Sequence, residues 1–201
     1  MKELNGIKNI IVDLGGVILN IDYQLTVDAF RSLGIDSFEY IFSQYKQSSL
    51  SDDFETGRIS ESEFYEGIKT NSGVEFTFEE FKIAWNALLL DLPKERINIL
   101  IKLSQNYRMF LFSNTNETHY KEFVTIVEND FNTIFENTYY SHQFGKRKPD
   151  ADSFLSIINE NNLNLKETLF IDDSIQHIKS ADSLGINTLL IKDKSITEIF
   201  S

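Results

Sequence analysis

Short runs of apolar residues alternate with longer amphipathic segments along most of the chain. The short runs are rich in branched and aromatic residues, as buried strands are, and occupy residues 9–14, 108–112, 168–171 and 188–191, with a weaker run at 137–141. Helical periodicity separates the later runs, at 94–104, 117–128, 151–160 and 174–184. This alternation predicts an α/β fold with a three-layer Rossmann-like core, in which helices cover both faces of a parallel sheet.

The segment 21–90 breaks the alternation, because it shows helical patterns and no convincing strand. The patterns lie at 24–32, 37–44, 61–69 and 78–90, and Ser60 and Glu63 are spaced as a capping box at the start of the third. We therefore expect a helical cap subdomain over 21–90, inserted into a catalytic core made of 1–20 and 91–201, with hinges near 20–23 and 91–93. The aromatic residues Phe64, Phe76, Phe78, Phe81 and Trp85 are expected to build the core of the cap.

The first predicted strand ends in an unexpected residue, since its apolar run stops at Asp13 and is followed by Gly15 and Gly16. A buried carboxylate is costly unless it is paired with a cation or bound to a metal. The two glycines allow the backbone to turn sharply and to approach whatever lies in front of the carboxylate. The pattern therefore indicates that Asp13 has a chemical role.

Polar residues also follow the other predicted strands. Ser113 and Asn114 end the second run, Asp172 and Asp173 end the fourth, and Lys148 stands just before a predicted helix. Because the carboxyl ends of parallel strands meet at one edge of a sheet, we expect these groups to lie together. Carboxylate oxygens suit Mg²⁺, and a cation with a lysine and hydroxyl or amide donors suits a phosphoryl group, which one carboxylate could attack.

Composition and charge narrow the choice of partners. The net charge of −12 argues against nucleic acid or an anionic membrane as a partner, and it requires a local cation if the substrate is an anion. The absence of cysteine excludes thiolate nucleophiles and cysteine-ligated metals. No segment reads as a secretory signal or reaches membrane-spanning length, so we expect a cytoplasmic protein, either a monomer or a weak homodimer.

The motifs IIVDLGGV, FLFSNT, KRKP and FIDDS resemble, in order and along nearly the whole chain, the four motifs of the haloacid dehalogenase superfamily of phosphatases. The insertion after the first motif is similar to the helical cap that closes over small substrates in one of its subfamilies. The resemblance implies an Mg²⁺-dependent phosphatase that acts on a small phosphorylated metabolite through an aspartyl-phosphate intermediate.

The resemblance also assigns roles to individual residues. It implies Asp13 as the nucleophile and Lys148 as the residue that stabilises the transferring phosphoryl group, which Ser113, Asn114 and the backbone near Gly16 would hold. The implied metal ligands are Asp13, the Gly15 carbonyl, Asp172 and Asp173.

One position departs from the superfamily pattern. Most of these phosphatases carry an aspartate, the general acid, two residues after the nucleophile, and this chain has Gly15 there. In this respect it resembles bacterial sugar-phosphate phosphatases that act on α-D-glucose 1-phosphate. Without the acid, departure of the leaving oxygen must be helped by another group, for which Asp22 and His119 are the first candidates, by water, or by the stability of the leaving group itself.

Outside the motifs, Arg58 is the main cap candidate for a substrate contact, with Asp22 and Tyr23 close behind. His119, His142 and His177 share no metal-ligand spacing and are expected to be surface or packing residues, and Lys146 and Arg147 are expected to be solvated.

Two alternative functions stay open. A 2-haloacid dehalogenase would use the same nucleophile without a metal, and the paired Asp172 and Asp173 count against it. The second alternative is a non-catalytic sensor of phosphate ligands, in which Gly15 in place of the general acid would indicate that catalytic activity has been lost.

Overall fold

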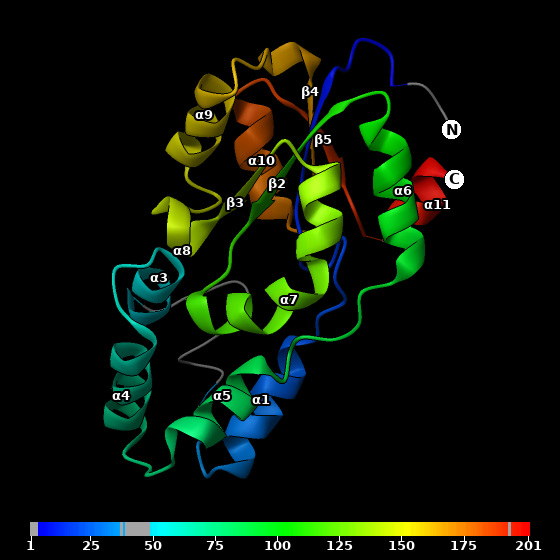
Figure 1. The fold of residues 1–201 in the computed structure, drawn as a ribbon. Helices are drawn as coiled ribbons and strands as arrows, with labels where there is room; N and C mark the ends of the chain where they lie inside the picture. The colour runs from blue at the N-terminus through cyan, green and yellow to red at the C-terminus, as the bar shows by residue number, and fades with distance from the viewer. Residues whose placement is uncertain (1–3, 37, 39–48, 193) are drawn as a thin grey trace.

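The computed structural model describes residues 4–36, 38, 49–192 and 194–201, and it contains a five-stranded parallel sheet with a group of helices below it (Figure 1). The strands are β1 (Asn9–Val12), β2 (Arg108–Ser113), β3 (Asn137–Tyr140), β4 (Thr168–Asp172) and β5 (Asn187–Leu190). Their order is β3-β2-β1-β4-β5, with every pair parallel. All five predicted strands are confirmed, including the weak one at β3.

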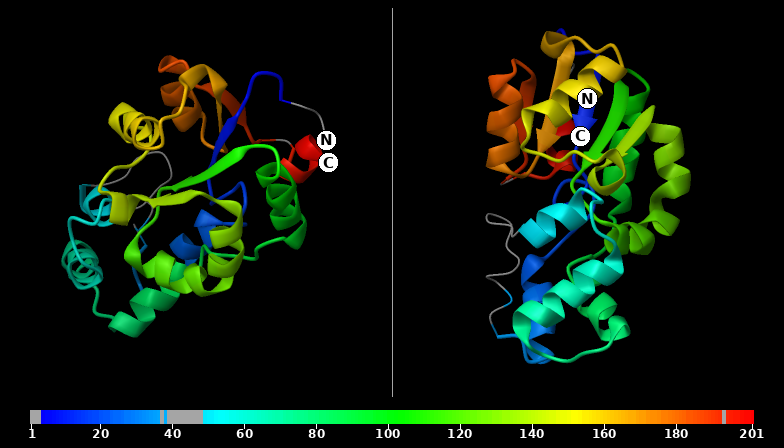
Figure 2. Two further views of the ribbon diagram at one scale, coloured as in Figure 1. Left: turned by 45° about the horizontal axis from the view of Figure 1, so that its top comes forward. Right: turned by 90° about the vertical axis from the view of Figure 1, so that its left-hand side faces the viewer.

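Helices cover both faces of the sheet, which confirms the predicted three layers (Figure 2). One face packs against α6 (Lys94–Ser104), α7 (Glu117–Ile134) and α11 (Ile196–Phe200), and the other against α9 (Ala151–Glu160) and α10 (Ile175–Ser183). Within β1, Ile10 and Val12 face the first layer and Ile11 faces the second, as the two-residue period of a strand requires. A short helix, α8 (Ser141–Phe144), and a 3₁₀ turn (Leu165–Glu167) complete the connections.

Among the described helices, α7 and α5 differ most in length from the prediction, and α4 also runs past its predicted end at 69 to Ser72. Helix α7 runs past the predicted end at 128, because Phe131 and Ile134 continue its apolar stripe into the core. In the cap, α5 (Phe78–Asn86) stops before the predicted end at 90, because Leu88 and Leu89 belong to the connection back to the core.

The cap helices pack around an aromatic core of their own. Besides α5 they are α1 (Tyr23–Ser32), α3 (Ser49–Glu55), which the sequence analysis missed, and α4 (Glu61–Ser72), which begins with the predicted capping box of Ser60 and Glu63. The expected core residues Phe64, Phe76, Phe81 and Trp85 are buried, together with Phe30, Phe38 and Phe54. The expectation was wrong for Phe78, which is 38% exposed because it is the first residue of α5, at the edge of the aromatic cluster, where its ring contacts Tyr65, Phe81 and Lys82. The predicted helix at 37–44 falls mostly outside the described residues.

Two antiparallel chain segments join the cap to the core. The Asn20 amide donates to the Asp91 carbonyl, and the Leu90 amide donates back to the Asn20 carbonyl, both at 3.0 Å. The Asp22 amide donates to the Leu88 carbonyl at 2.9 Å. These bonds lie at the two predicted hinges, and we infer that the cap begins and ends at this pair of segments.

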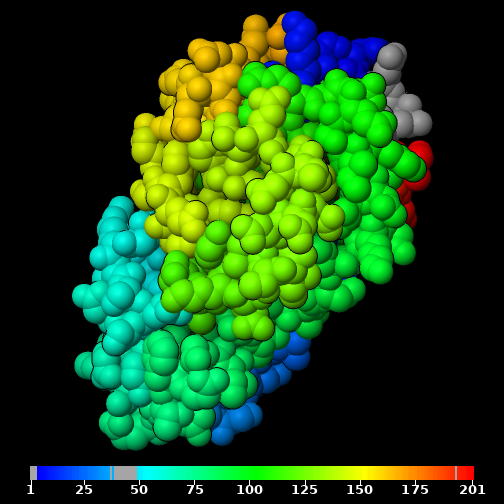
Figure 3. Space-filling model, viewed as in Figure 1, coloured from blue at the N-terminus to red at the C-terminus, as the bar shows by residue number. Residues whose placement is uncertain are grey.

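The cap also rests directly on the core. Helix α5 contacts α7, and helix α3 contacts α8. The second contact lies where the cyan surface of α3 adjoins the yellow-green surface in Figure 3. The indole N–H of Trp85 donates to Asn116 Oδ1 at 3.1 Å, and Thr118 Oγ1 donates to Glu61 Oε1 at 2.9 Å. Among the described residues, none of the helices is long and apolar enough to cross a membrane.

Candidate active site

The carboxyl ends of β1 and β4 deliver charged groups to the point where the strand order reverses. The chain leaves β1 toward β2 and leaves β4 toward β5, so a crevice opens between the two central strands at this edge. Asp13 directly follows β1 and Asp172 ends β4. Lys148 Nζ lies 2.8 Å from Asp13 Oδ1 and 2.7 Å from Asp172 Oδ2, and its side chain is fully buried. The structure thus brings together three of the predicted site residues.

The Asn114 side chain holds Lys148 in place. Its Nδ2 donates to the Lys148 carbonyl at 2.8 Å, and its Oδ1 accepts from the Lys148 amide at 2.9 Å. Asn114 also lines the pocket, as does Ser113, which ends β2. The structure therefore gives the Asn114 side chain a positioning role that the sequence analysis did not foresee.

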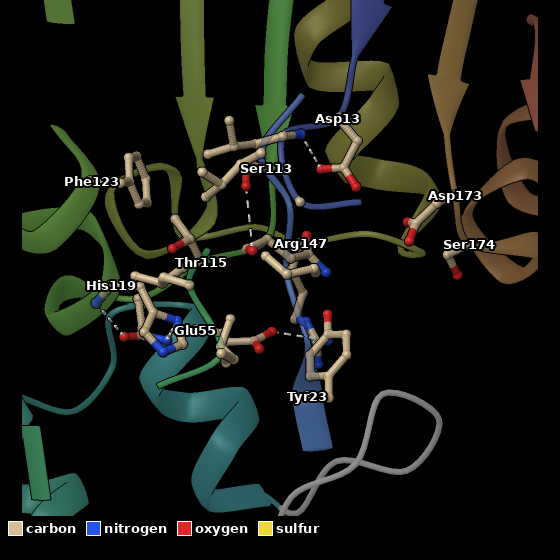
Figure 4. Close-up of a pocket in the computed structure, with 18 of the residues that line it drawn as sticks. Asp13, Tyr23, Glu55, Ser113, Thr115, His119, Phe123, Arg147, Asp173 and Ser174 are labelled. Carbon is tan, nitrogen blue, oxygen red and sulfur yellow. Dashed lines mark hydrogen bonds and ion pairs between the residues drawn. The ribbon is translucent and has the colours of Figure 1, made fainter. Parts of the chain in front are cut away.

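The neighbouring carboxylates Asp172 and Asp173 have different surroundings. Asp172 accepts from Lys148 through Oδ2, from the Ser174 amide at 2.7 Å through Oδ1, and from His177 Nδ1 at 3.0 Å. Asp173 instead lines the pocket, on the same side as Asp13 (Figure 4). Gly16, at φ +73°, is required beneath it, because a Cβ atom there would lie 2.3 Å from Asp173 Oδ2. Gly16 therefore makes room for Asp173.

The pKa values show a cluster with too much negative charge for one lysine. Burial, together with Asp172 and Asp173, raises the pKa of Asp13 well above its usual value despite Lys148. Burial and the charge of Asp172 raise the pKa of Asp173 to about 6. Burial alone would raise the pKa of Asp172 too, but Lys148 and His177 outweigh it and lower that pKa to about 2. A further cation would stabilise the ionised forms of Asp13 and Asp173.

The donor atoms at this edge fit a hard cation. Asp13, Asp172 and His177 have potential ligand atoms within 4.8 Å of one another, but His177 bonds to Asp172 and imidazole does not suit Mg²⁺. Asp13 and Asp173 are the carboxylates that line the core side of the pocket, and Gly15, two residues after Asp13, lines it as well. Of the predicted ligands, Asp13, the Gly15 carbonyl and Asp173 therefore fit Mg²⁺ best, while the bonds of Asp172 favour a role in holding Lys148.

The far side of the pocket carries three polar residues from separate segments. They are Tyr23 at the start of α1, Glu55 at the end of α3, and Arg147 in the loop before α9. Figure 4 shows the Tyr23 hydroxyl directed toward the side of the pocket that holds Asp13 and Asp173. The rest of the lining is mixed. Its apolar residues are Leu14, Leu19, Ile21, Leu88, Leu89 and Phe123, and its further polar residues are Thr115, Asn116, His119, Ser174 and His177.

The structure corrects two expectations on this side. Arg58 is not among the pocket-lining residues, because its side chain is 66% exposed and pairs with Asp53 at 3.0 Å. Arg147 was expected to be solvated, but its side chain is only 16% exposed and pairs with Asp52 and Glu55 of the cap. The position of Arg147 directly before Lys148 could have predicted that it lies near the site. Glu55 also lines the pocket, but no sequence motif around it predicts this. Tyr23, a secondary candidate, does line the pocket.

Neither residue considered as a replacement acid is suited to that role. His119 is buried and stacks on Trp85, its Nδ1 accepts from Asn116 Nδ2, and its Nε2 donates to the Trp85 carbonyl. Burial lowers its pKa to about 4, so the ring is neutral near pH 7. Because hydrogen bonds already occupy both ring nitrogens, His119 is a packing residue. Asp22 caps α1 by accepting from the Gln24 amide and does not line the pocket.

Comparison of the chain with known proteins shows the family to which it belongs. The sequence pattern of haloacid dehalogenase-like hydrolases matches residues 10–191. The chain belongs to this family. It is 32% identical over 187 residues to a D-ribitol-5-phosphate phosphatase of Bacteroides thetaiotaomicron, with 90% of each chain covered.

Solved structures of the haloacid dehalogenase family share the whole fold. An aspartate-to-alanine mutant of a family enzyme from Bacteroides thetaiotaomicron, in complex with magnesium and inorganic phosphate, is 32% identical with a TM-score of 0.88, covering 97% of this chain and 99% of that one. A predicted hydrolase of the family from Porphyromonas gingivalis is 31% identical with a TM-score of 0.85, covering 96% of each chain. The L-2-haloacid dehalogenase of Xanthobacter autotrophicus, at 19% identity and a TM-score of 0.64 over 94% of this chain and 79% of that one, is similar in fold alone.

Proposed function

We propose that this family member is an Mg²⁺-dependent phosphatase that hydrolyses a small phosphorylated sugar or polyol. The observation that carries the proposal is the grouping of Asp13, Asp172 and Asp173 around one lysine, with Asp13 and Asp173 facing the same pocket. Such a cluster is suited to a divalent cation and, through it, to a phosphate dianion. The magnesium-bound and phosphate-bound relative supports this choice over the metal-free dehalogenase.

The residues of the chain support a two-step displacement. The Asp13 carboxylate attacks phosphorus, the P–O bond to the leaving group breaks, and an aspartyl-phosphate forms. Water then attacks that phosphorus and releases inorganic phosphate together with the regenerated carboxylate. Lys148, fixed by Asn114, holds Asp13 in position and places a positive charge beside the reacting phosphoryl group, and Ser113 contributes a hydroxyl from the end of β2. Bound magnesium would supply additional positive charge toward the phosphoryl oxygens.

The choice between sugar and polyol phosphates depends on the leaving oxygen. With Gly15 in place of an acid, a leaving group of low basicity is favoured, and the anomeric oxygen of a sugar such as glucose 1-phosphate leaves more readily than a primary alkoxide. The resemblance to a D-ribitol-5-phosphate phosphatase supports an acyclic polyol phosphate instead. Both substrates belong in the same test.

The test is a screen of phosphorylated metabolites with Mg²⁺ and again with EDTA, measuring phosphate release. We expect turnover of sugar or polyol phosphates that EDTA abolishes and Mg²⁺ restores. Phosphate release that persists in EDTA would contradict the requirement for Mg²⁺, and chloride release from 2-chloropropionate would support the dehalogenase. Absence of turnover with every ester would support the sensor. If glucose 1-phosphate exceeds glucose 6-phosphate in kcat/KM, the leaving-group argument for Gly15 holds.

A further inference from the structure

The polar residues on the cap side of the pocket form one charged surface, which we call the cap-side wall: Tyr23, Glu55 and Arg147. Glu55 is 8% exposed, and its Oε2 lies 3.1 Å from Arg147 Nη2, the contact drawn between them in Figure 4. Arg147 also pairs with Asp52, one turn earlier on α3. The wall therefore combines groups from α1, α3 and the loop that carries Lys148.

The balance of charge on the cap-side wall determines what can bind against it. The Arg147 guanidinium faces two carboxylates, those of Asp52 and Glu55, so within the described part of the chain this cation is already more than neutralised. Burial and the Glu55 charge raise the pKa of Tyr23, so its phenol stays a neutral hydroxyl. Among the residues that the structure describes, the wall therefore offers no surplus positive charge to a second anionic group of the substrate.

The cap-side wall lies where the leaving group of a bound phosphate ester would be. If the phosphoryl group binds beside Asp13 and Asp173, the leaving group extends toward Glu55 and Arg147, which line the same pocket from the other side. A substrate hydroxyl can donate to a carboxylate and accept from a guanidinium or a phenol, whereas a substrate carboxylate would be repelled by Glu55. Hydrogen bonds to charged groups are the stronger kind, so hydroxyls should be selected positively.

We propose that the cap-side wall, through Glu55 held against Arg147, selects leaving groups that are neutral and bear hydroxyls and rejects leaving groups that carry a second anionic group. The proposal rests on the phosphatase function proposed above and narrows its substrate class. It assigns Glu55 and Arg147 as specificity-determining residues.

The test compares kcat/KM for three esters of primary alcohols: D-ribitol 5-phosphate, propyl phosphate and 2-phosphoglycolate. The wild type should prefer them in that order. Glu55→Gln should lower kcat/KM for ribitol 5-phosphate by about tenfold and raise it for phosphoglycolate by about tenfold, because the repelling charge is gone and the charge-assisted bond is weakened. Arg147→Gln should act in the opposite direction on phosphoglycolate, lowering its kcat/KM further.

Asp53→Asn is the matched control. It removes the same charge from the same helix, but Asp53 pairs with exposed Arg58 and does not line the pocket, so all three kcat/KM values should stay unchanged. If Glu55→Gln shifts the ratio of the ribitol and phosphoglycolate values no more than Asp53→Asn does, the proposal is overturned while the phosphatase stands.

A binding experiment separates failure of this proposal from failure of the phosphatase function. Calorimetry with Mg²⁺ in an Asp13→Asn background, with and without Glu55→Gln, measures Kd for the same three esters without turnover. A shift of preference from ribitol 5-phosphate toward phosphoglycolate supports the wall even if no ester is hydrolysed by the wild type. Equal preference in both proteins contradicts it. Thermal unfolding of each variant shows whether the fold is retained.

Discussion

The two sides of the pocket are built in different ways. On the core side, Asp13, Ser113 and Asp173 stand at or just after the ends of neighbouring strands, and ladder pairing sets their spacing. Lys148 lies buried behind Asp13, in a loop bonded to Asn114. On the cap side, Tyr23 and Glu55 come from two different cap helices, and Arg147 of the core reaches them only because the cap rests on the core.

This difference separates chemistry from specificity. Under the proposed function, the sheet edge holds the groups that act on phosphorus, whose geometry is the same for every phosphate ester. In the same proposal the cap presents the surface that meets the variable leaving group, and its helices lie outside the strand ladder. Substitutions on the core side should therefore change kcat for all esters, and substitutions on the cap side should change the ranking of esters.

The largest effect is expected for the nucleophile. Asp13→Asn should lower kcat by at least about 10⁴-fold for every ester, since an amide cannot form the acyl-phosphate. Because burial and two neighbouring carboxylates raise the pKa of Asp13, a neutral side chain should leave the melting temperature unchanged or higher. Steady-state kinetics and thermal unfolding measure both. Near-wild-type kcat in this variant would rule out covalent catalysis by Asp13.

Lys148→Ala should give a smaller loss of rate and a loss of stability. We expect kcat to fall by about 10²- to 10³-fold, because a positive charge beside the phosphoryl group is removed. Asp13 and Asp172 would lose their shared partner, which should cost about 3–5 kcal/mol of unfolding free energy without metal.

Added Mg²⁺ should restore part of that stability in Lys148→Ala. Denaturant titrations with and without Mg²⁺ check this. Equal stability of Lys148→Ala and the wild type would show that the carboxylates do not depend on the lysine.

The contact of cap and core should make stability depend on pH through His119. Its pKa is lowered to about 4 from 6.5 by burial, so the unfolded chain binds the proton more tightly. Stability should be complete above about pH 6.5 and fall by about 3 kcal/mol as the pH approaches 4.

In His119→Gln the drop between pH 7 and pH 5 should be smaller, though present, because burial also lowers the pKa values of His142 and His177. Urea unfolding at several pH values measures this. An unchanged pH profile in the variant would exclude His119 as the source.

The smallest effect is expected at Arg58. Arg58→Ala removes only an exposed pair with Asp53, so kcat/KM should change by less than about twofold and stability by less than about 1 kcal/mol. A selective loss of kcat/KM with one ester would mean that Arg58 contacts the substrate when the cap is in a different position. Arg58 would then belong to the cap side of the pocket.

The sequence by itself determined the sheet, the order of its elements and the core side of the pocket. Strand ends can be read from apolar runs, and parallel strands bring their carboxyl ends to one edge, so Asp13, Ser113, Lys148 and Asp173 could be grouped before any coordinates. The aromatic cap core followed from composition and spacing, apart from the exposed Phe78.

Only the tertiary structure decided which residues form the cap side of the pocket and which different roles the adjacent Asp172 and Asp173 have. Glu55 and Arg147 lie far apart in the sequence, and their contact depends on how α3 docks against the loop before α9, which no local pattern encodes. Asp172 and Asp173 are adjacent and chemically identical, yet one binds Lys148 and the other faces the pocket. The physical reason is that docking of helices and the direction of side chains after a strand depend on packing between distant segments, whereas strand and helix formation depends largely on the periodicity of residues close in sequence.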